Sequence, residues 1–549
     1  MRFLKTPRSG WKIVLTLAIL IAVVSGMVFW LPLLRENPLA GLPSGNQAFR
    51  DTAVQYVRAV AENYFDGQTT LSSSELEISG DWKINVTIYY EGEIRGAGEA
   101  KKGNTMLSLV MAEATRTALE NGSQDLTVAT IADARFLVSL PNQSISFIEY
   151  NGEGKELLGN LVITRSLDKE LLLQNIEQGK EFLLRALNKD KNGFYKKYDT
   201  LNDDFGDRVY TVYSASIIYT LLKVYDFDGD ERIQSGIADW SDFLLSMQSK
   251  DKKTYGAFHY SYYFNSGEKE PRFVVGTTAL SIFTLLDLYQ RTGEAKYLTA
   301  AELGGDWLTT MQWDDGWMKP YKRYHDDKWF HGVKKSLLYN GQVLSALSRL
   351  YDVTGEHKYY DTAEKIAQNF TERVEKEGSY LGDDYRSKNP ISSAWVIMSL
   401  MDFYKVNPDD YYRDMILKCS SDIVSRQQLN TDKLLYYGTW QDAYSTSGNG
   451  WLDEVMMTVY KFDQEQGVTG ADKYKQAAIK ATWWIIQNTY SAENTFFLKE
   501  PQKAIGGSFW NYENLYVRTD SLCHALNADI ALVNEMTDGE LLSIPEQPF

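Results

Sequence analysis

The chain has 549 residues, enough for two or three domains, with a formal net charge of −16 and an aromatic content of 13%. The excess of acidic residues argues against nucleic acid and anionic lipid surfaces as partners. Cys419 and Cys523 are the only cysteines, so we expect two core thiols and no disulfide framework.

Near its N-terminus the chain has an apolar segment, residues 13–34, that is long enough to cross a bilayer as one helix. Four basic residues precede the segment and one follows closely: Arg2, Lys5, Arg8, Lys12 and Arg35. The positive-inside rule then predicts that residues 1–36 are a cytoplasmic tail and a single-pass anchor in the cell membrane, with the bulk of the chain extracytoplasmic. A cleaved signal peptide is the alternative, but no A-x-A site follows the apolar run.

A small α+β domain is predicted at residues 47–165, after a linker at 37–46 that contains Pro and Gly. Two segments have helical patterns and two alternate as strands do: 49–65, 106–120, 82–90 and 134–140. The order of these elements, with Ile94-Arg95-Gly96 after the first strand, resembles the AMMECR-like domain family. We interpret the domain as a packing or positioning module rather than a second active site.

Residues 166–536 repeat a pair of helices six times. The turn T-G-x-x-K-Y recurs at 292–297, 354–359 and 469–474, and Gly355 suits the left-handed position that ends a helix. One such hairpin cannot bury both of its apolar faces, so the copies should stack on one another.

The second helix of each pair is the richer in apolar and small residues, which predicts an inner ring of six helices inside an outer ring of six. The inner helices are expected at 210–225, 274–289, 338–351, 391–404, 451–462 and 520–536. The predicted fold is therefore mainly α, an (α/α)6 toroid preceded by a transmembrane helix and a small α+β domain, with a tail at 537–549. This region resembles the six-hairpin glycan-processing enzymes, and an open solenoid is the main alternative.

One loop of the first repeat has the spacing of an EF-hand calcium loop, with a glycine at its sixth position. Its candidate metal ligands are Asn188, Asp190, Asn192 and Asp199. A second acidic loop at 226–230 lacks the closing acid. Both loops also lie where the repeat needs a polar turn. No cofactor is required by these patterns, and calcium is the one cation for which they offer ligands.

In a toroid of this kind, the N-termini of the inner helices and the returns before them line a funnel, and binding sites favour such concave places. Paired carboxylates there could act as the acid and the base or nucleophile of glycoside hydrolysis. Acids near helix N-termini also serve as caps. The candidate catalytic residues are Asp384, Asp453, Glu513 and Tyr516, and the candidate substrate-binding residues are Trp317, Tyr385, Trp451, His259 and Arg272.

The sharpest local pattern is Arg518-x-Asp520-x-x-x-His524, in which Asp520 and His524 share one face of a helix. It resembles the C-terminal domain of the D-glucuronyl C5-epimerases. The resemblance implies inversion of uronic acid residues within polysaccharides, by removal and return of the C5 proton, and makes these three residues catalytic candidates. The alternative is a buried network that fastens the last helix to the first.

These observations predict a membrane-anchored, extracytoplasmic enzyme that modifies a polysaccharide, of the uronyl epimerase, lyase or glycoside hydrolase type. A non-catalytic glycan-binding or scaffold protein of a cell-surface polysaccharide system is the alternative. A terpene-type toroid ranks last, because the chain has no D-x-D-D motif and its His and Cys residues lack the spacing of metal ligands.

Overall fold

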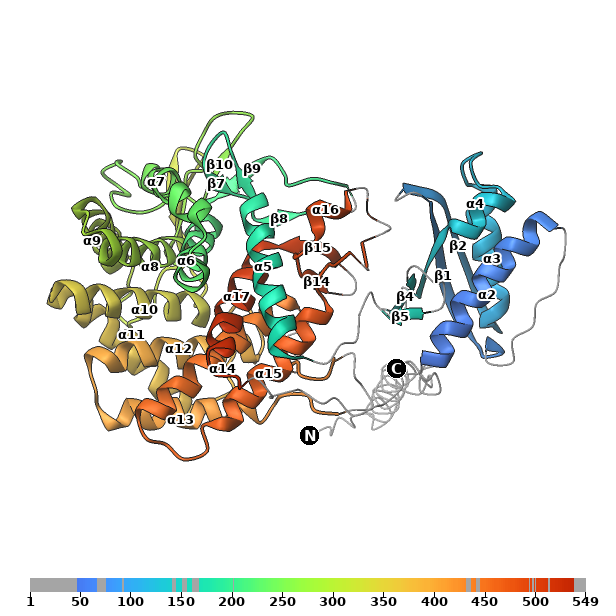
Figure 1. Ribbon diagram of the computed structural model, residues 1–549. Coiled ribbons are helices and arrows are strands. Elements are labelled where there is room, and N and C mark those ends of the chain that lie inside the picture. Colours follow the sequence, from blue (N-terminus) through green and yellow to red (C-terminus); the bar gives the residue numbers. More distant parts are fainter. Residues whose placement is uncertain are drawn as a thin grey trace, which may run out of the picture.

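The computed structural model describes a small α+β domain and a large helical ring (Figure 1). The described residues are 47–66, 76–90, 93–140, 145–150, 156–159, 167–200, 202–430, 436–440, 445–492, 494–495, 498, 500–511 and 514–537. The segment predicted to anchor the chain, 13–34, and nearly all of the tail lie outside these residues. Of the helices that are described, none combines the length and the apolar character needed to span a membrane.

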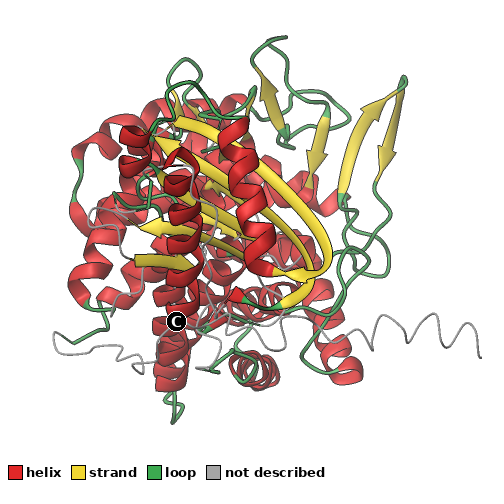
Figure 2. Cartoon of the chain, turned by 90° about the vertical axis from the view of Figure 1, so that its right-hand side faces the viewer, coloured by secondary structure: helices red, strands yellow, loops and turns green. Residues whose placement is uncertain are grey.

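The α+β domain is a five-stranded antiparallel sheet in the order β2-β1-β3-β4-β5. Its strands are β1 (Ser79–Tyr90), β2 (Glu93–Met106), β3 (Arg135–Leu140), β4 (Ile145–Tyr150) and β5 (Glu156–Gly159), and its helices are α2 (Gln47–Asp66), α3 (Leu107–Glu120) and α4 (Val128–Asp133). The helices cover one face of the sheet, and the other face turns toward the ring (Figures 1 and 2). The four predicted elements are confirmed.

The Ile94-Arg95-Gly96 segment lies in β2, where glycine is needed for close packing. A Cβ atom at Gly96 would lie 2.4 Å from the carbonyl oxygen of Ala118, and one at Gly98 would lie 2.3 Å from that of Ala114. The glycines therefore let α3 lie directly against the strand.

The ring consists of twelve main helices in two concentric layers. The outer helices are α5 (Lys169–Arg185), α7 (Glu231–Ser246), α9 (Ala295–Thr310), α11 (His357–Glu377), α13 (Asp410–Val424) and α15 (Asp472–Gln487). The inner helices are α6 (Thr211–Asp228), α8 (Val275–Thr292), α10 (Leu337–Thr354), α12 (Pro390–Val406), α14 (Thr446–Glu465) and α17 (Thr519–Val533). Each inner helix packs against the next, and α17 packs against α5 and α6, so the ring is closed and the open solenoid is excluded.

A glutamine at the end of three outer helices joins neighbouring repeats. The Gln248 amide donates to the carbonyl oxygens of Gly256 and Ala300 at 2.9 and 2.8 Å, and Gln312 and Gln427 make the same pair of bonds in their own repeats. Gly256 has φ +87°, and a Cβ there would meet the Leu303 carbonyl oxygen at 2.0 Å. The glycine-aromatic returns thus follow from close contact with the next outer helix.

Three inner helices end at a glycine, as the repeated turn predicts. Gly229, Gly293 and Gly355 are C-caps with φ of 72°, 69° and 69°, and each donates its N–H to the carbonyl of the tyrosine four residues earlier. The left-handed position of Gly355 is thereby confirmed.

Short strands and one short helix decorate the end of the ring where the inner helices begin. They are β6 (Leu187–Asn188), β7 (Gly193–Phe194), β8 (Lys197–Tyr198), β9 (Arg208–Tyr210), β10 (Ser261–Tyr263), β11 (Arg272–Val274), β12 (Tyr321–His325), β13 (Lys328–His331), β14 (Phe509–Asn511), β15 (Asn514–Arg518) and α16 (Pro501–Ala504). Three of them, β9, β11 and β15, stand directly before inner helices, and the hairpin β12–β13 precedes α10. Strands β14 and β15 contribute Trp510 and Arg518 to the lining of the central cavity.

Candidate active site

A cavity of about 890 Å³ lies at the centre of the ring, and all six inner helices contribute side chains to it. Its wall holds Tyr213 and Tyr219 of α6, Phe283 of α8, Tyr339 and Arg349 of α10, Trp395 of α12, Trp451 and Glu454 of α14, and Asp520 and His524 of α17. The volume and the aromatic lining are typical of small-molecule sites.

Two tryptophans form the flattest part of the wall. Trp395 and Trp451 are stacked, with ring centroids 4.0 Å apart and planes inclined by 17°, and both are 5% exposed. Trp510 also lines the cavity and lies under the guanidinium of Arg518, 4.4 Å from its ring centroid to Cζ. These packed rings give the cavity a rigid, apolar stretch of wall.

Arg518 and Asp520 form a bidentate ion pair at the N-terminus of α17. Arg518 Nε donates to Asp520 Oδ1 at 2.9 Å, and its Nη2 donates to Asp520 Oδ2 at 2.6 Å and to the Tyr213 hydroxyl at 2.7 Å. Strand β15 ends at Arg518 and α17 begins one residue later, so this short turn holds the pair at the cavity. Ser447 donates a further hydrogen bond to Asp520.

Glu454 and His524 form a second pair, which joins α14 to α17. His524 Nδ1 lies 2.8 Å from Glu454 Oε2, and Asn527 donates to Glu454 Oε1 at 2.8 Å. Burial would raise the pKa of the Glu454 carboxyl, but the hydrogen bond from His524 and the charge of Lys223 hold it below its usual value. With Nδ1 engaged by the carboxylate, Nε2 is the nitrogen of His524 that can exchange a proton with a ligand.

Arg349 of α10 lines the cavity and contacts three neighbouring side chains. Arg349 donates from Nε and Nη2 to Asp402 at 3.1 and 2.9 Å, and its Cζ lies 4.2 Å from the ring centroid of Phe283. The Tyr219 hydroxyl accepts from Arg349 at 3.4 Å. The charge of Lys223, followed by that of Arg349, lowers the pKa of Tyr219 despite its burial.

Asp453 does not line the cavity, contrary to the expectation for the fifth inner helix. Its carboxyl is fully buried between helices, accepts from Thr482 at 2.7 Å and lies close to Asp529. Burial raises the pKa of Asp453 well above its usual value. The residue that faces the cavity is its neighbour Glu454, which the sequence analysis did not select as catalytic. The sequence did contain one indication of this position. Glu454 follows Trp451 by three residues, and residues three apart lie on the same face of a helix.

Two more expected residues lie at the cavity mouth. Tyr385 lines it and is 44% exposed. Arg272 stacks over Tyr260 and Tyr321, with Cζ 4.8 and 5.3 Å from their ring centroids, at the edge of the same opening. The ring of Tyr260 lines the cavity, so Arg272 lies just outside it.

Four expected residues lie elsewhere, and one is not described. His259 contacts the Glu270 carbonyl through Nδ1 and packs on Phe273. Tyr516 stacks on Trp510, outside the cavity wall. Asp384 and Trp317 line a neighbouring hollow instead. Glu513 lies outside the described residues, so its place in the site stays a prediction.

In the predicted calcium loop, side-chain oxygen atoms accept hydrogen bonds from nearby residues of the same loop. Asn188 Oδ1 accepts from the Lys191 N–H at 3.0 Å, and Asp199 accepts from both nitrogens of Asn202. Within the described part of the chain, no cluster of three or more His, Cys, Asp or Glu could hold a metal ion. Asp190 and Asn192 are on the same loop, and calcium binding there stays a prediction.

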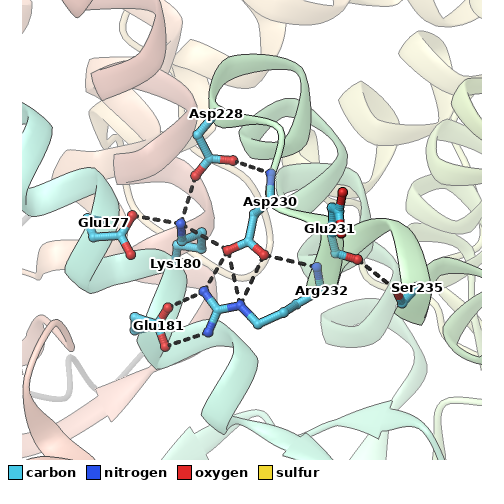
Figure 3. A network of polar contacts seen from close by, with 8 residues as sticks. All are labelled: Glu177, Lys180, Glu181, Asp228, Asp230, Glu231, Arg232 and Ser235. Carbon is cyan, nitrogen blue, oxygen red and sulfur yellow. Dashed lines mark hydrogen bonds and ion pairs between the residues drawn. The ribbon is translucent and has the colours of Figure 1, made fainter.

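The second acidic loop already encloses a positive charge. Lys180 Nζ lies 2.8 Å from Asp228, 3.1 Å from Asp230 and 2.6 Å from Glu177, and its side chain is 5% exposed (Figure 3). Arg232 completes the network by bonding Asp230 and Glu181. The ammonium of Lys180 thus takes the central position that a bound cation would need, and the loop fastens α5 to α7.

One family model and several solved structures match parts of this chain. The family model of Glycosyl Hydrolase Family 88 matches residues 330–505, and no curated protein matches the chain. Among solved structures, the cellobiose 2-epimerase of Bacillus thermoamylovorans B4167 has a TM-score of 0.54 at 13% identity, covering 67% of this chain and 99% of that one. The cellobiose 2-epimerase of Spirochaeta thermophila DSM 6192 has a TM-score of 0.51 at 15% identity, covering 67% and 96%.

A D-mannose isomerase gives a TM-score of 0.51 at 15% identity, covering 67% of this chain and 98% of that one. At these identities the likeness establishes the fold, which is that of the (α/α)6 toroids. Together with the partial match to a glycosyl hydrolase family, it supports the expectation of a carbohydrate-active enzyme.

Proposed function

We propose that this chain is a membrane-anchored, extracytoplasmic enzyme that modifies an anionic, uronate-containing polysaccharide in its central cavity. The observation that carries the proposal is the convergence of two charged pairs on one cavity wall. His524, oriented by Glu454, and Arg518, oriented by Asp520, both reach the cavity from the N-terminal part of α17. An oriented imidazole beside an arginine suits proton transfer next to a carboxylate.

Unpaired polar atoms in the wall support a sugar as the ligand. The indole Nε1 of Trp451, the amide oxygen of Gln342 and the amide oxygen of Asn527 are buried and have no hydrogen-bond partner among the described residues. Buried polar atoms are nearly always hydrogen-bonded, so a ligand that supplies both donors and acceptors would suit this wall if small side-chain movements expose them. Sugar hydroxyls supply both, and the tryptophan faces suit the apolar face of a pyranose ring.

The charges around the mouth support an acidic sugar. Three arginines and two carboxylates line the cavity: Arg349, Arg386, Arg518, Glu454 and Asp520. Arg386, Arg272 and Lys196 have no ion-pair partner among the described residues, although the chain as a whole is strongly acidic. Cationic groups without a carboxylate partner favour the binding of carboxylates from a ligand.

The chemistry follows from removal of the C5 proton of a uronate residue. His524 Nε2 accepts this proton, and the electron pair of the C–H bond moves into the substrate carboxyl group, whose added charge Arg518 and Arg386 stabilise. Return of a proton to the opposite face of C5 inverts the residue. Expulsion of the oxygen at C4, with a proton delivered to it, breaks the chain instead. Because the hydrogen bond from His524 and the charge of Lys223 hold the pKa of Glu454 below its usual value, this carboxyl suits orienting the imidazole better than protonating a glycosidic oxygen as hydrolysis requires.

One assay separates the three reactions. The purified chain is incubated with alginate, polygalacturonate and a glucuronate polymer in deuterated water. Deuterium at C5 without cleavage identifies an epimerase, ultraviolet absorbance from an unsaturated product identifies a lyase, and new reducing ends without that absorbance identify a hydrolase. If the polymers are bound but unchanged, the scaffold alternative replaces the enzyme. If none is bound or changed, the proposal fails.

A further inference from the structure

A second hollow of about 550 Å³ adjoins the central cavity on its outer side. It lies between the return before α10 and the one before α12, and Arg386 and Ser387 line both spaces. Tyr385, which precedes them in the chain and lines the central cavity, has the ammonium of Lys334 5.4 Å from its ring centroid. The two hollows are therefore neighbours that meet at Arg386 and Ser387, and we call the second one the outer groove.

The acidic side chains of the outer groove are turned onto the backbone. Asp383 accepts from the N–H groups of Leu337 at 2.7 Å and of Tyr385 and Arg386 at 2.9 Å each, and Asp384 accepts from the N–H of Lys335 at 2.8 Å. These donors stabilise the two carboxylates and fix the shape of the loop.

The rest of the lining includes four cations, one tryptophan and a third acid, Glu377. Trp317 lies between Lys335 and Arg373, whose charged groups are 5.4 and 5.6 Å from its ring centroid. These two cations also pair with Asp315 and Glu377. Arg386 and Lys388 have no carboxylate partner in the described part of the chain, and both are exposed.

We propose that the outer groove binds further residues of the anionic chain whose reacting residue occupies the central cavity. The substrate is then a polymer or a long oligomer, held by its carboxylates along Arg386 and Lys388 and released slowly. This inference rests on the proposed function and adds to it the recognition of chain length.

The test removes two groove cations that do not line the central cavity, in the double variant Lys335→Ala/Lys388→Ala. Lys418→Ala/Lys461→Ala is the matched control, because it removes the same charge from exposed positions on α13 and α14 away from both hollows. Binding and turnover are measured on polygalacturonate and alginate polymers, on the corresponding uronate disaccharides, and on neutral dextran.

The groove variant is expected to bind the anionic polymers about tenfold more weakly than the control variant, with faster dissociation and unchanged disaccharide turnover. Equal polymer affinity in the groove and control variants overturns the inference while leaving the proposed function intact. Failure of the unaltered protein to bind or turn over both polymers and disaccharides overturns the proposed function, and the groove inference with it.

Discussion

His524 of α17 lies with Nδ1 2.8 Å from Glu454 Oε2 of α14, at the wall of the central cavity. The carboxylate fixes which ring nitrogen carries the proton, and so decides which one faces a substrate. Glu454 is itself held by Asn527 and Lys223, so the imidazole rests on a rigid support.

His524→Gln is expected to lower the turnover number by about 10²–10⁴-fold, because it removes the group that transfers the proton. Glu454→Gln should lower it less, since the imidazole remains but loses its orientation. The measurement is kcat and KM on the active polymer, with thermal unfolding as the control for folding. Unchanged kcat in both variants would remove this pair from the reaction.

The buried carboxyl of Asp529 makes stability depend on pH. It accepts from Asn175 of α5 at 2.7 Å, which helps to close the ring, and burial raises its pKa from 3.8 to about 7. The folded state therefore holds a proton that the unfolded state loses as the pH rises from about 4 to 7, and stability falls over this window. Asp529→Asn should make the fall smaller, with the remainder due to other buried acids such as Asp453, and raise stability at neutral pH by up to a few kcal/mol.

The comparison is made by denaturant unfolding across this pH window. Asp361→Asn is the control, because Asp361 is exposed on α11. If the free energy of unfolding falls with pH as steeply in Asp529→Asn as in the control, the assignment to Asp529 is wrong.

Lys180→Met should destabilise the ring, because it leaves Asp228, Asp230 and Glu177 close together without their shared cation. Loss of one partner from a buried ionic network costs about 3 kcal/mol. Lys189→Met, at an exposed position in the following loop, should have little effect. Equal unfolding midpoints for the two variants would show that the network in Figure 3 is not a fastener.

The topology can be tested on intact cells. Protease added outside should degrade the ring while a cytoplasmic marker stays whole, because the positive-inside rule places the bulk of the chain outside. Protection of the ring until the membrane is permeabilised would reverse the predicted orientation. Release of the full chain from membranes by salt alone would exclude the anchor.

The ring could be predicted from the sequence because its signals are local and repeated. The T-G-x-x-K-Y turns depend on one glycine conformation, and the helices between them have a regular apolar stripe, so Gly355 and its copies locate the hairpins. The closure of the ring could not be read from the repeats alone, because stacked hairpins also form open solenoids; it depends on the contacts of α17 with α5 and α6.

The site was harder to predict because it depends on which face of each helix turns inward. Asp453 and Glu454 are adjacent, yet one lies in the core and the other at the cavity, and acidity alone does not distinguish them. Tyr213, Tyr219 and Arg349 come from helix positions that look like ordinary core and carry no motif. The Arg518–Asp520–His524 pattern succeeded in marking the cavity wall because its three residues lie on one short turn and one helix face.

The most direct test of the account is Arg518→Ala, measured for turnover of the uronate polymer and for thermal unfolding in parallel. The account predicts that turnover is abolished, since the substrate carboxylate loses its partner as charge builds up, while the unfolding temperature changes little. A sharp fall in the unfolding temperature with polymer binding unchanged would contradict it. Arg518 would then be a structural tie between Asp520 and Tyr213, and the scaffold alternative would stand in place of the enzyme.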